Sequence, residues 1–203
     1  MVGEQGLRQG AGMNLPRCIE TPRVRLRDPR PADAESAFRH WGSDPAVLRY
    51  LGILPHESPD DTRRQIGHDL HRWLKGSGWV WAMTLRASAG VPGLAPDEAF
   101  GLVELQPMSQ PGMAAHHLRL GYLMGQAAWG QGLMREALAA LGEIALAQPS
   151  VWRLDALCDL DNLASARLLA RLGWACEGCH RRAVIHPNVS PTPRDVWVYA
   201  LTR

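Results

Sequence analysis

The stretch from Leu118 to Glu136, LRLGYLMGQAAWGQGLMRE, constrains the fold of this 203-residue chain more than any other. It reads as a strand, a short glycine-bearing turn and the first turn of a helix, with Gly130 and Gly132 at the junction. Because glycine lacks a Cβ atom, its backbone N–H groups can approach an anion closely, and a helix start adds unpaired N–H groups and the positive end of its dipole. This order therefore predicts a phosphate site and a nucleotide-containing ligand.

The rest of the chain has the composition of a soluble globular domain. Apolar residues make up 46% and charged residues 21%, and the formal net charge of +2 is too small to indicate a nucleic-acid partner. No apolar run approaches the length that crosses a membrane, and the N-terminus lacks the apolar core of a secretory signal. We therefore expect a cytoplasmic protein.

The first residues are polar and rich in glycine. Residues 1–18 are expected to form a flexible tail, and residues 19–203 a single domain, since neither a linker nor an internal repeat divides them. Met13 is an alternative start of the chain, because structured patterning begins only near Ile19.

Seven segments read as strands, either by alternation or as short apolar runs. They are Thr21–Arg27, Trp79–Leu85, Phe100–Leu105, Leu118–Met124, Trp152–Cys158, Trp174–Ala183 and Val196–Leu201. Helical segments lie between them, with proline or capping residues at their starts and glycine or proline beyond their ends. These are Pro31–Trp41, the short Asp44–Leu51, Ser58–Leu74, Leu133–Ala147 and Asn162–Leu172. The order predicts an α/β (α+β) domain, in which helices pack on a mixed sheet.

Several motifs of the second half occur together in one known family. The residues that carry them are Gly121, Tyr122, Leu123, Trp129, Gly130, Gly132, Glu136, Ala137, Leu138, Asn162, Ser165, Leu172, Gly173 and Trp174. In this order and spacing they resemble the GNAT superfamily of acyl-CoA-dependent N-acetyltransferases. These motifs are most similar to those of the Rim-type branch, which acetylates the N-terminal amines of ribosomal proteins. The resemblance extends from about Thr21 to the C-terminus.

The resemblance implies a mostly antiparallel sheet of about seven strands, flanked by about four helices. Its fourth and fifth strands, Leu118–Met124 and Trp152–Cys158, are expected to splay apart and to leave a gap for the pantetheine arm of acetyl-CoA. A ligand in that gap can pair with the free edge of the fourth strand as an added strand would. Leu123 and Met124 are expected to supply the backbone groups for this pairing.

The pyrophosphate of acetyl-CoA is expected to lie on backbone amides of the glycine turn. These amides belong to Trp129, Gly130, Gln131, Gly132, Leu133 and Met134. Asn162, at the start of the next helix, is expected to hydrogen-bond the pantetheine arm. Taken singly, the glycines could make only a tight turn and Asn162 could only cap its helix, but the combination favours cofactor binding.

Acetyl transfer to an amine requires three groups around the thioester. The amine must lose a proton, since an α-amine has a pKa of about 8 and a lysine of about 10.4. The carbonyl oxygen needs a hydrogen-bond donor, and the departing thiolate needs a proton. The amide of Met124 is the expected donor to the oxygen, and the resemblance places Ser165 close to the sulfur as the acid. Ser165 could instead be only a capping serine of the first helical turn.

Glu104 is the expected base. It lies in an apolar strand that should border the acceptor site, and burial there would raise the pKa of the carboxylate, which suits this role. Glu104 could instead be an outward-facing polar residue of an alternating strand. The alternatives are His116 and His117, which precede the fourth strand, or a water-mediated route with no side-chain base.

The sequence therefore predicts an acetyl-CoA-dependent N-acetyltransferase that acts on a primary amine, either a protein N-terminal α-amine or a small molecule. A non-catalytic CoA-binding regulatory module is the alternative. No metal is expected, since Cys176 and Cys179 form only half of a zinc site. A homodimer is compatible with the resemblance, because dimers are common in this fold. The identity of the acceptor stays open, since the loops near Pro55–Asp61 and Ile185–Arg194 carry no decisive motif.

Overall fold

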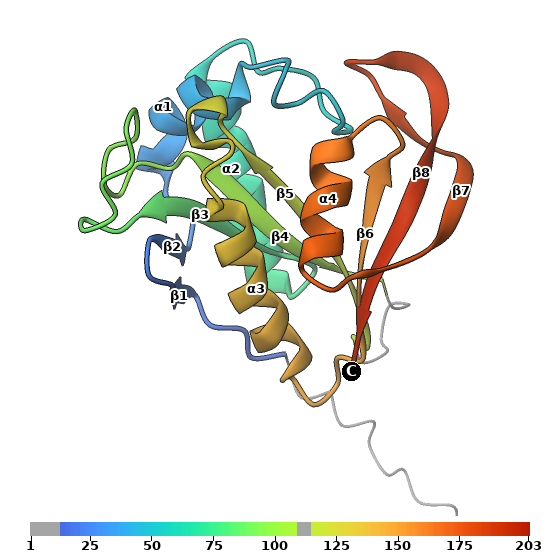
Figure 1. The fold of residues 1–203 in the computed structure, drawn as a ribbon. Coiled ribbons are helices and arrows are strands. Elements are labelled where there is room, and N and C mark those ends of the chain that lie inside the picture. Colours follow the sequence, from blue (N-terminus) through green and yellow to red (C-terminus); the bar gives the residue numbers. More distant parts are fainter. Residues whose placement is uncertain (1–12, 109–114) are drawn as a thin grey trace, which may run out of the picture.

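A computed structural model describes residues 13–108 and 115–203 of the chain. Within these residues, eight strands form one sheet in the order β1-β2-β3-β4-β5-β6-β8-β7 (Figure 1). The strands are β1 (Cys18–Glu20), β2 (Val24–Arg27), β3 (Trp79–Leu85), β4 (Gly101–Pro107), β5 (His117–Met124), β6 (Arg153–Asp159), β7 (Ala175–His186) and β8 (Ser190–Thr202). Neighbouring strands run antiparallel except β5 and β6, which are parallel.

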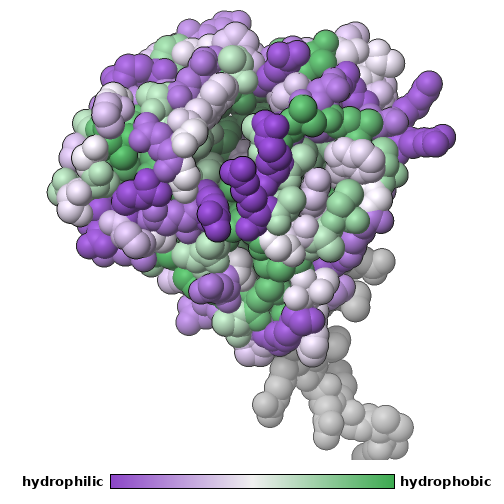
Figure 2. Space-filling model, in the orientation of Figure 1, coloured by the Kyte–Doolittle hydropathy of each residue, from purple (hydrophilic) through white to green (hydrophobic). Residues whose placement is uncertain are grey.

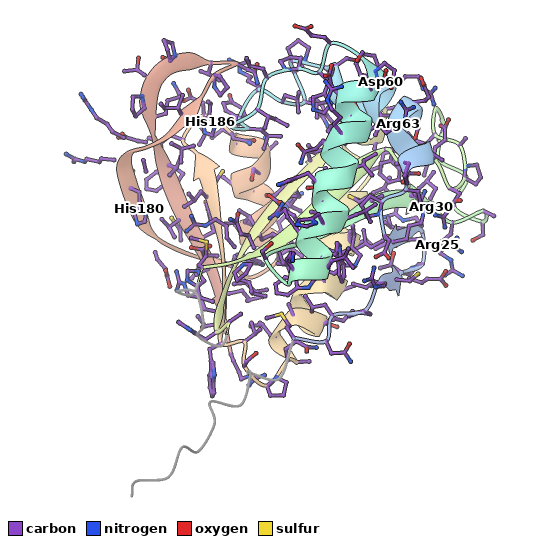
Figure 3. All side chains as sticks on the ribbon, turned by 180° about the vertical axis from the view of Figure 1, so that it is seen from behind. Arg25, Arg30, Asp60, Arg63, His180 and His186 are labelled. Atoms are coloured by element: carbon purple, nitrogen blue, oxygen red, sulfur yellow. The ribbon has the colours of Figure 1, made fainter. Side chains whose placement is uncertain are left out.

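Helices cover both faces of the sheet (Figures 1 and 3). They are η1 (Pro31–Asp33), α1 (Ala34–Ala37), η2 (Phe38–Gly42), α2 (Pro59–Lys75), η3 (Gln126–Ala128), α3 (Leu133–Leu146) and α4 (Leu163–Arg171). Figure 1 shows α3 and α4 in front of the sheet, and Figure 3 shows α2 crossing the sheet from behind. None of the described helices is long and apolar enough to cross a membrane.

The ends of α2 show how the sequence sets a helix boundary. Ser58 and Asp61 form a reciprocal capping box at its start, with Pro59 as the first helical residue. Gly76 ends the helix with a φ of +63°, the left-handed conformation that glycine adopts without a steric penalty. The expected helix at Ser58–Leu74 is therefore confirmed to within a residue of each end.

The parallel pairing of β5 with β6 is short. In the described part of the chain it joins only three residue pairs, from His117 with Arg153 to Arg119 with Asp155. Beyond these pairs, β5 remains paired with β4 up to Met124, and β6 remains paired with β8 up to Asp159. The two strands therefore diverge toward their C-terminal ends, and the expected splay between the fourth and fifth predicted strands is confirmed at β5 and β6.

Three sequence expectations need correction. The sheet has an eighth strand, β1, of which only Cys18 belongs to the expected tail. Residues 1–12 of that tail lie outside the described residues. In its last part, Leu15 is only 5% exposed and the carbonyl of Pro16 accepts a hydrogen bond from the Trp81 indole, so the chain contacts the core before the first strand begins.

The expected short helix at Asp44–Leu51 is a series of turns. The Asp44 carboxylate accepts hydrogen bonds from the N–H groups of Ala46 and Val47, as a helix N-cap does, but the turns that follow are not continued into a helix. The expected loop at Ile185–Arg194 is mostly a hairpin, in which β7 continues to His186 and β8 begins at Ser190. Polar residues on both faces of these strands hid their length from pattern analysis.

A buried ion pair fixes the segment from Pro31 to Gly42 against the sheet. Arg27 on β2 donates two hydrogen bonds to the Asp33 carboxylate, at 2.8 and 2.7 Å, and both side chains are less than 10% exposed. Asp33 also accepts the N–H of Arg30 at 2.7 Å. Such a bidentate pair holds geometry strongly, because either charge left alone in the interior would be costly.

We predict that Arg27→Ala lowers the free energy of unfolding by about 3–5 kcal/mol, because it leaves the Asp33 carboxylate buried without its partner. Arg25→Ala is the matched control: Arg25, also on β2, is only partly buried and pairs with exposed Glu20, so its loss should cost about 0–1 kcal/mol. Urea unfolding of both variants measures the difference. Equal losses for the two variants would contradict the prediction.

Candidate active site

The glycine turn before α3 has the predicted backbone. Gly130 and Gly132 have φ angles of +73° and +75°, and Gly132 is the N-cap residue of α3. No described side chain caps this helix, whereas Ser58 caps α2 and Asn162 caps α4. The first N–H groups of α3 therefore remain available, together with the positive end of the helix dipole, to an anion at the turn.

The residues of β5 direct their backbone groups alternately to its two neighbours. The N–H of Gly125 donates to Phe100 and the N–H of Met108 donates to His117, so odd-numbered residues of β5 pair with β4. The N–H and C=O groups of Tyr122 and Met124 consequently face the gap beside β6. The backbone groups of Leu123, which were expected to face the gap, are instead turned toward β4. Its side chain lies in an apolar cluster with Trp41.

Trp129 lies against the end of β5. Its indole N–H donates to the carbonyl of Met124 at 2.6 Å, although 47% of the residue is exposed. Gln131 closes the same turn, because its side-chain amide donates to the carbonyl of Ala127 at 3.1 Å. The side chain of Trp129 therefore holds the one gap-facing carbonyl that lies nearest to the glycine turn.

Ser165 forms a hydroxyl pair with Tyr122. The distance between Tyr122 Oη and Ser165 Oγ is 2.6 Å, and the backbone N–H of Ser165 is capped by Asn162 Oδ1 at 3.2 Å. Burial raises the pKa of Tyr122, against the opposing effect of its hydrogen bond with Ser165, so the phenol stays protonated. Sequence reasoning used Tyr122 only as part of a motif and missed this contact, which links β5 to α4 across the gap.

Asn162 performs the capping role that was one of its two expected functions. Its side-chain oxygen is taken by Ser165, while its side-chain nitrogen has no hydrogen-bond partner among the described residues. Nearby Cys158 is buried on β6, and this burial raises the pKa of its thiol. The side-chain N–H groups of Asn162 are thus available at the edge of the gap, and Cys158 is an unreactive neighbour.

Glu104 lies on the opposite face of the sheet from Ser165. Its partner across the strands is Gly121, and the Glu104 side chain occupies the place where a Cβ atom of Gly121 would stand. Arg72 of α2 donates to Glu104 Oε2 at 3.0 Å, and the carboxylate is about one-third exposed. Gly121 therefore allows the carboxylate to extend over β5 toward the gap.

A second acid shares the Arg72 guanidinium. Asp69 Oδ1 lies 3.6 Å from Arg72 Nη1 and accepts a hydrogen bond from Gln65 at 3.0 Å. Burial raises the pKa of Asp69 to about 6, although Gln65 and Arg72 favour its charged form. Arg72 and Asp69 were not singled out from the sequence, because only the fold brings α2 over β4.

The alternative bases lie elsewhere. His117 is at the paired end of β5, with its Nε2 atom 3.1 Å from Asp155 Oδ2, and burial lowers its pKa despite that carboxylate. The residue before it, His116, is at the same end of the strand. Both are at the N-terminal end of β5, whereas Ser165 contacts Tyr122 near the other end. The structure therefore brings Glu104, rather than the histidines, closer to the divergent part of the two strands.

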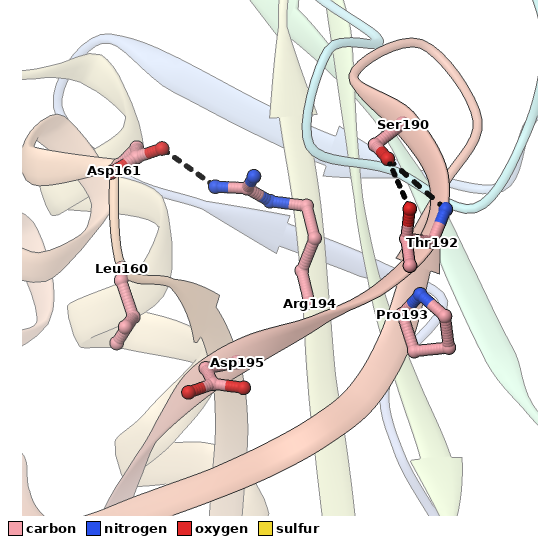
Figure 4. A pocket seen from close by; sticks show the side chains of 7 residues that line it. All are labelled: Leu160, Asp161, Ser190, Thr192, Pro193, Arg194 and Asp195. Atoms are coloured by element: carbon pink, nitrogen blue, oxygen red, sulfur yellow. Dashed lines mark hydrogen bonds and ion pairs between the residues drawn. The ribbon is translucent and has the colours of Figure 1, made fainter.

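Two hollows lie at the end of the sheet where β5 and β6 diverge. Figure 2 shows one beside the end of β5, between α4 and the turn into α3, with hydrophilic side chains at its rim. A cavity of about 380 Å³ lies farther along, where Arg194 donates to Asp161 and Ser190 contacts Thr192 (Figure 4).

The Asn188 side chain joins the β7–β8 turn to the carbonyls of Leu48 and Ile53, at 2.9 and 2.7 Å. This contact bridges the two halves of the domain over the gap.

Among the described residues, no three His, Cys, Asp or Glu side chains gather as they would around a metal ion. Cys176 and Cys179, both on β7, are exposed free cysteines.

Comparison with known proteins identifies the class to which this fold and site belong. Residues 23–175 match the acetyltransferase (GNAT) domain family. A protein of Bacillus licheniformis described as an uncharacterized N-acetyltransferase, p20, is 26% identical over 163 residues, which are 80% of this chain and 85% of that protein. The chain therefore belongs to the GNAT acetyltransferase family and is an acetyltransferase, as the resemblance predicted.

Two solved structures show the same fold at low sequence identity. RimL, a ribosomal L7/L12 alpha-N-protein acetyltransferase in complex with coenzyme A, has a TM-score of 0.74 at 19% identity, and covers 91% of this chain and 97% of its own. The microcin C7 self-immunity acetyltransferase MccE, in complex with acetyl-CoA and AMP, has a TM-score of 0.75 at 17% identity, with 93% and 98% covered. The family membership implies acetyl-CoA as the acetyl donor.

We predict that Gly132→Val weakens CoA binding by at least about tenfold, because a β-branched residue at this φ strains the turn that presents the amides. Gly76→Val is the matched control, since Gly76 has a φ of +63° but ends α2, away from the turn. Calorimetric titration with CoA compares the two variants. Wild-type affinity in Gly132→Val would exclude the turn from the binding site.

Proposed function

We propose that the protein transfers the acetyl group of acetyl-CoA to a primary amine, by direct attack of the amine on the thioester. The observation that carries the proposal is the uncapped glycine turn of α3 at the head of the gap between β5 and β6, with the Ser165–Tyr122 hydroxyl pair bordering that gap. The turn suits a pyrophosphate, and the free backbone edge of β5 suits a pantetheine arm that pairs as an added strand.

The cofactor-binding residues follow from this placement. The amides of residues 129–134 hold the pyrophosphate, as expected from the sequence. Tyr122 and Met124, rather than Leu123, offer their backbone groups to the pantetheine arm, and the free side-chain N–H groups of Asn162 add a donor. The carbonyl of Met124 already accepts the Trp129 indole N–H, so a pantetheine amide that pairs with it uses the second lone pair of the oxygen or displaces the indole.

The chemistry divides between the two faces of the sheet. On the α2 side, Glu104 accepts a proton from the incoming ammonium group, directly or through water, and the neutral nitrogen attacks the thioester carbon. The N–H of Met124 donates to the carbonyl oxygen as negative charge develops there. As the C–N bond forms and the C–S bond breaks, the nitrogen releases its second proton to solvent, and Ser165 on the α4 side gives its proton to the leaving thiolate and regains one from solvent.

Tyr122 orients Ser165 for this step. Because burial keeps the phenol protonated, its hydroxyl can donate to Ser165 Oγ at 2.6 Å and leave the serine hydrogen directed away from it. A serine whose oxygen already accepts a hydrogen bond is also a better donor.

The acceptor is a primary amine, either a protein N-terminal α-amine or a small molecule. RimL is described as a ribosomal L7/L12 alpha-N-protein acetyltransferase, which supports a protein α-amine as one candidate acceptor. MccE is described as a microcin C7 self-immunity acetyltransferase, so proteins of this fold are not confined to ribosomal roles. Release of free thiol from acetyl-CoA, measured across a panel of peptides and small amines, tests the proposal. Tight CoA binding without acceptor-dependent thiol release would favour a regulatory CoA-binding module instead.

For Ser165→Ala we predict a fall in kcat of about a hundredfold, with the KM for acetyl-CoA changed by no more than about twofold, because the acid acts on the leaving group rather than in binding. Tyr122→Phe, which keeps the serine but removes its partner, should lower kcat less. Steady-state kinetics of both variants check this order. An unchanged kcat in Ser165→Ala would remove the serine from the mechanism.

For Glu104→Gln we predict a large fall in kcat, because an amide cannot accept the proton of the incoming ammonium group. Glu177→Gln, which changes a carboxylate paired with Arg153 on the far strand β7, is the control and should keep the wild-type kcat. If Glu104→Gln also keeps the wild-type kcat, the base is water or a histidine.

A further inference from the structure

The segment between β1 and β2 is joined to the glycine turn before α3 by a hydrogen-bond network that spans more than a hundred residues of sequence. Glu136 lies in the first turn of α3, and its Oε1 atom accepts Thr21 Oγ1 at 2.6 Å and the N–H of Arg23 at 2.7 Å. Its Oε2 atom accepts Arg23 Nε at 2.8 Å. The same carboxylate also lies 3.3 Å from the N–H of Val24.

Arg23 extends this network into the glycine turn itself. Its Nη1 atom donates to the carbonyl of Gln131 at 2.9 Å, and Gln131 is the residue between the two glycines. Its Nη2 atom lies 3.6 Å from the position of a Cβ atom on Gly132. One guanidinium therefore holds both the helix, through Glu136, and the turn, through Gln131.

The orientation of a peptide plane explains why this contact matters. Its C=O and N–H groups point in opposite directions, so fixing the Gln131 carbonyl toward Arg23 turns the following N–H, that of Gly132, away from Arg23. Two glycines at positive φ leave the turn with many accessible conformations unless something restrains it. The Arg23 fork supplies that restraint, and its planar geometry lets it bind two acceptors at once.

The charges at the network are nearly balanced. Glu136 is 17% exposed and Arg23 is 39% exposed. Partial burial alone would raise the pKa of Glu136, but the hydrogen bonds from Thr21 and Arg23 hold it below its ordinary value. A carboxylate this close to a phosphate site repels the phosphate, so attraction to the ligand does not explain its presence there.

We propose that Arg23, held by Glu136 and Thr21, is a positioning residue that sets the amides of the glycine turn for the CoA pyrophosphate. The inference rests on the proposed placement of the pyrophosphate at this turn. It assigns the TPRVRLR segment a role in cofactor affinity, beyond its place in the sheet.

A positioning role of Glu136 and a purely electrostatic role predict opposite changes in CoA affinity for Glu136→Gln. Glu136→Gln removes a negative charge near the phosphates, so electrostatics alone would tighten CoA binding. If Glu136 acts by positioning Arg23, the same variant weakens CoA binding, by about tenfold, as does Arg23→Gln, since each breaks a charge-assisted hydrogen bond. Arg23→Lys keeps the positive charge but lacks the planar guanidinium, so its CoA binding should remain as weak as that of Arg23→Gln.

The experiment uses two acetyl donors and one binding measurement. CoA affinity is measured by calorimetry, and kcat/KM is measured with acetyl-CoA and with acetyl-pantetheine, which lacks the pyrophosphate. We expect Arg23→Gln and Glu136→Gln to lose CoA affinity and acetyl-CoA efficiency, while acetyl-pantetheine efficiency stays within about twofold of wild type. Arg25→Gln, which changes the next arginine along the chain, should behave as wild type throughout.

Three outcomes would overturn the inference. Unchanged or tighter CoA binding in Glu136→Gln would show that the carboxylate does not position the turn. Equal losses with both donors would show a general defect of the fold. A wild-type protein that binds CoA no better than pantetheine would refute the pyrophosphate placement itself, and the inference with it; this result is distinguishable because it needs no variant.

Discussion

The site depends on where one ladder of hydrogen bonds stops. β5 and β6 pair over three residue pairs in the described chain, and then each continues with its other neighbour alone. An unpaired strand edge inside a protein is costly unless another group satisfies it. The divergence of β5 and β6 therefore creates a need for a partner that can pair with the backbone of Tyr122 and Met124, and an amide-bearing pantetheine arm meets it. The rest of the site is arranged around this edge.

The sequence predicted the parts of the site that depend on local geometry. Gly130 and Gly132 have the positive φ angles that their motif requires, and α3 begins where the GxG pattern ends. Asn162 and Ser165 lie at the start of α4, as the order of elements indicated. Each of these features is fixed by residues within one or two turns of chain, so a single segment carries the information.

Features that depend on pairing between distant segments could not be predicted from the sequence as well. Register decides which residues of β5 face the gap, and Leu123 was assigned there although its backbone pairs with β4. The contact of Glu104 with Arg72 joins β4 to α2, and that of Ser165 with Tyr122 joins α4 to β5. No pattern within one segment contains these contacts. The short strand β1 was missed because three residues are too few to show an alternation.

The hydrogen bond from Trp129 to the Met124 carbonyl has a consequence for how a ligand enters the gap. A ligand amide that pairs with this carbonyl either shares it with the indole N–H, since a carbonyl oxygen has two lone pairs, or displaces the indole. In both cases the surroundings of the indole change when the gap is filled. Trp129 is thus a natural fluorophore at the head of the gap, and its emission would report occupancy of the β5 edge.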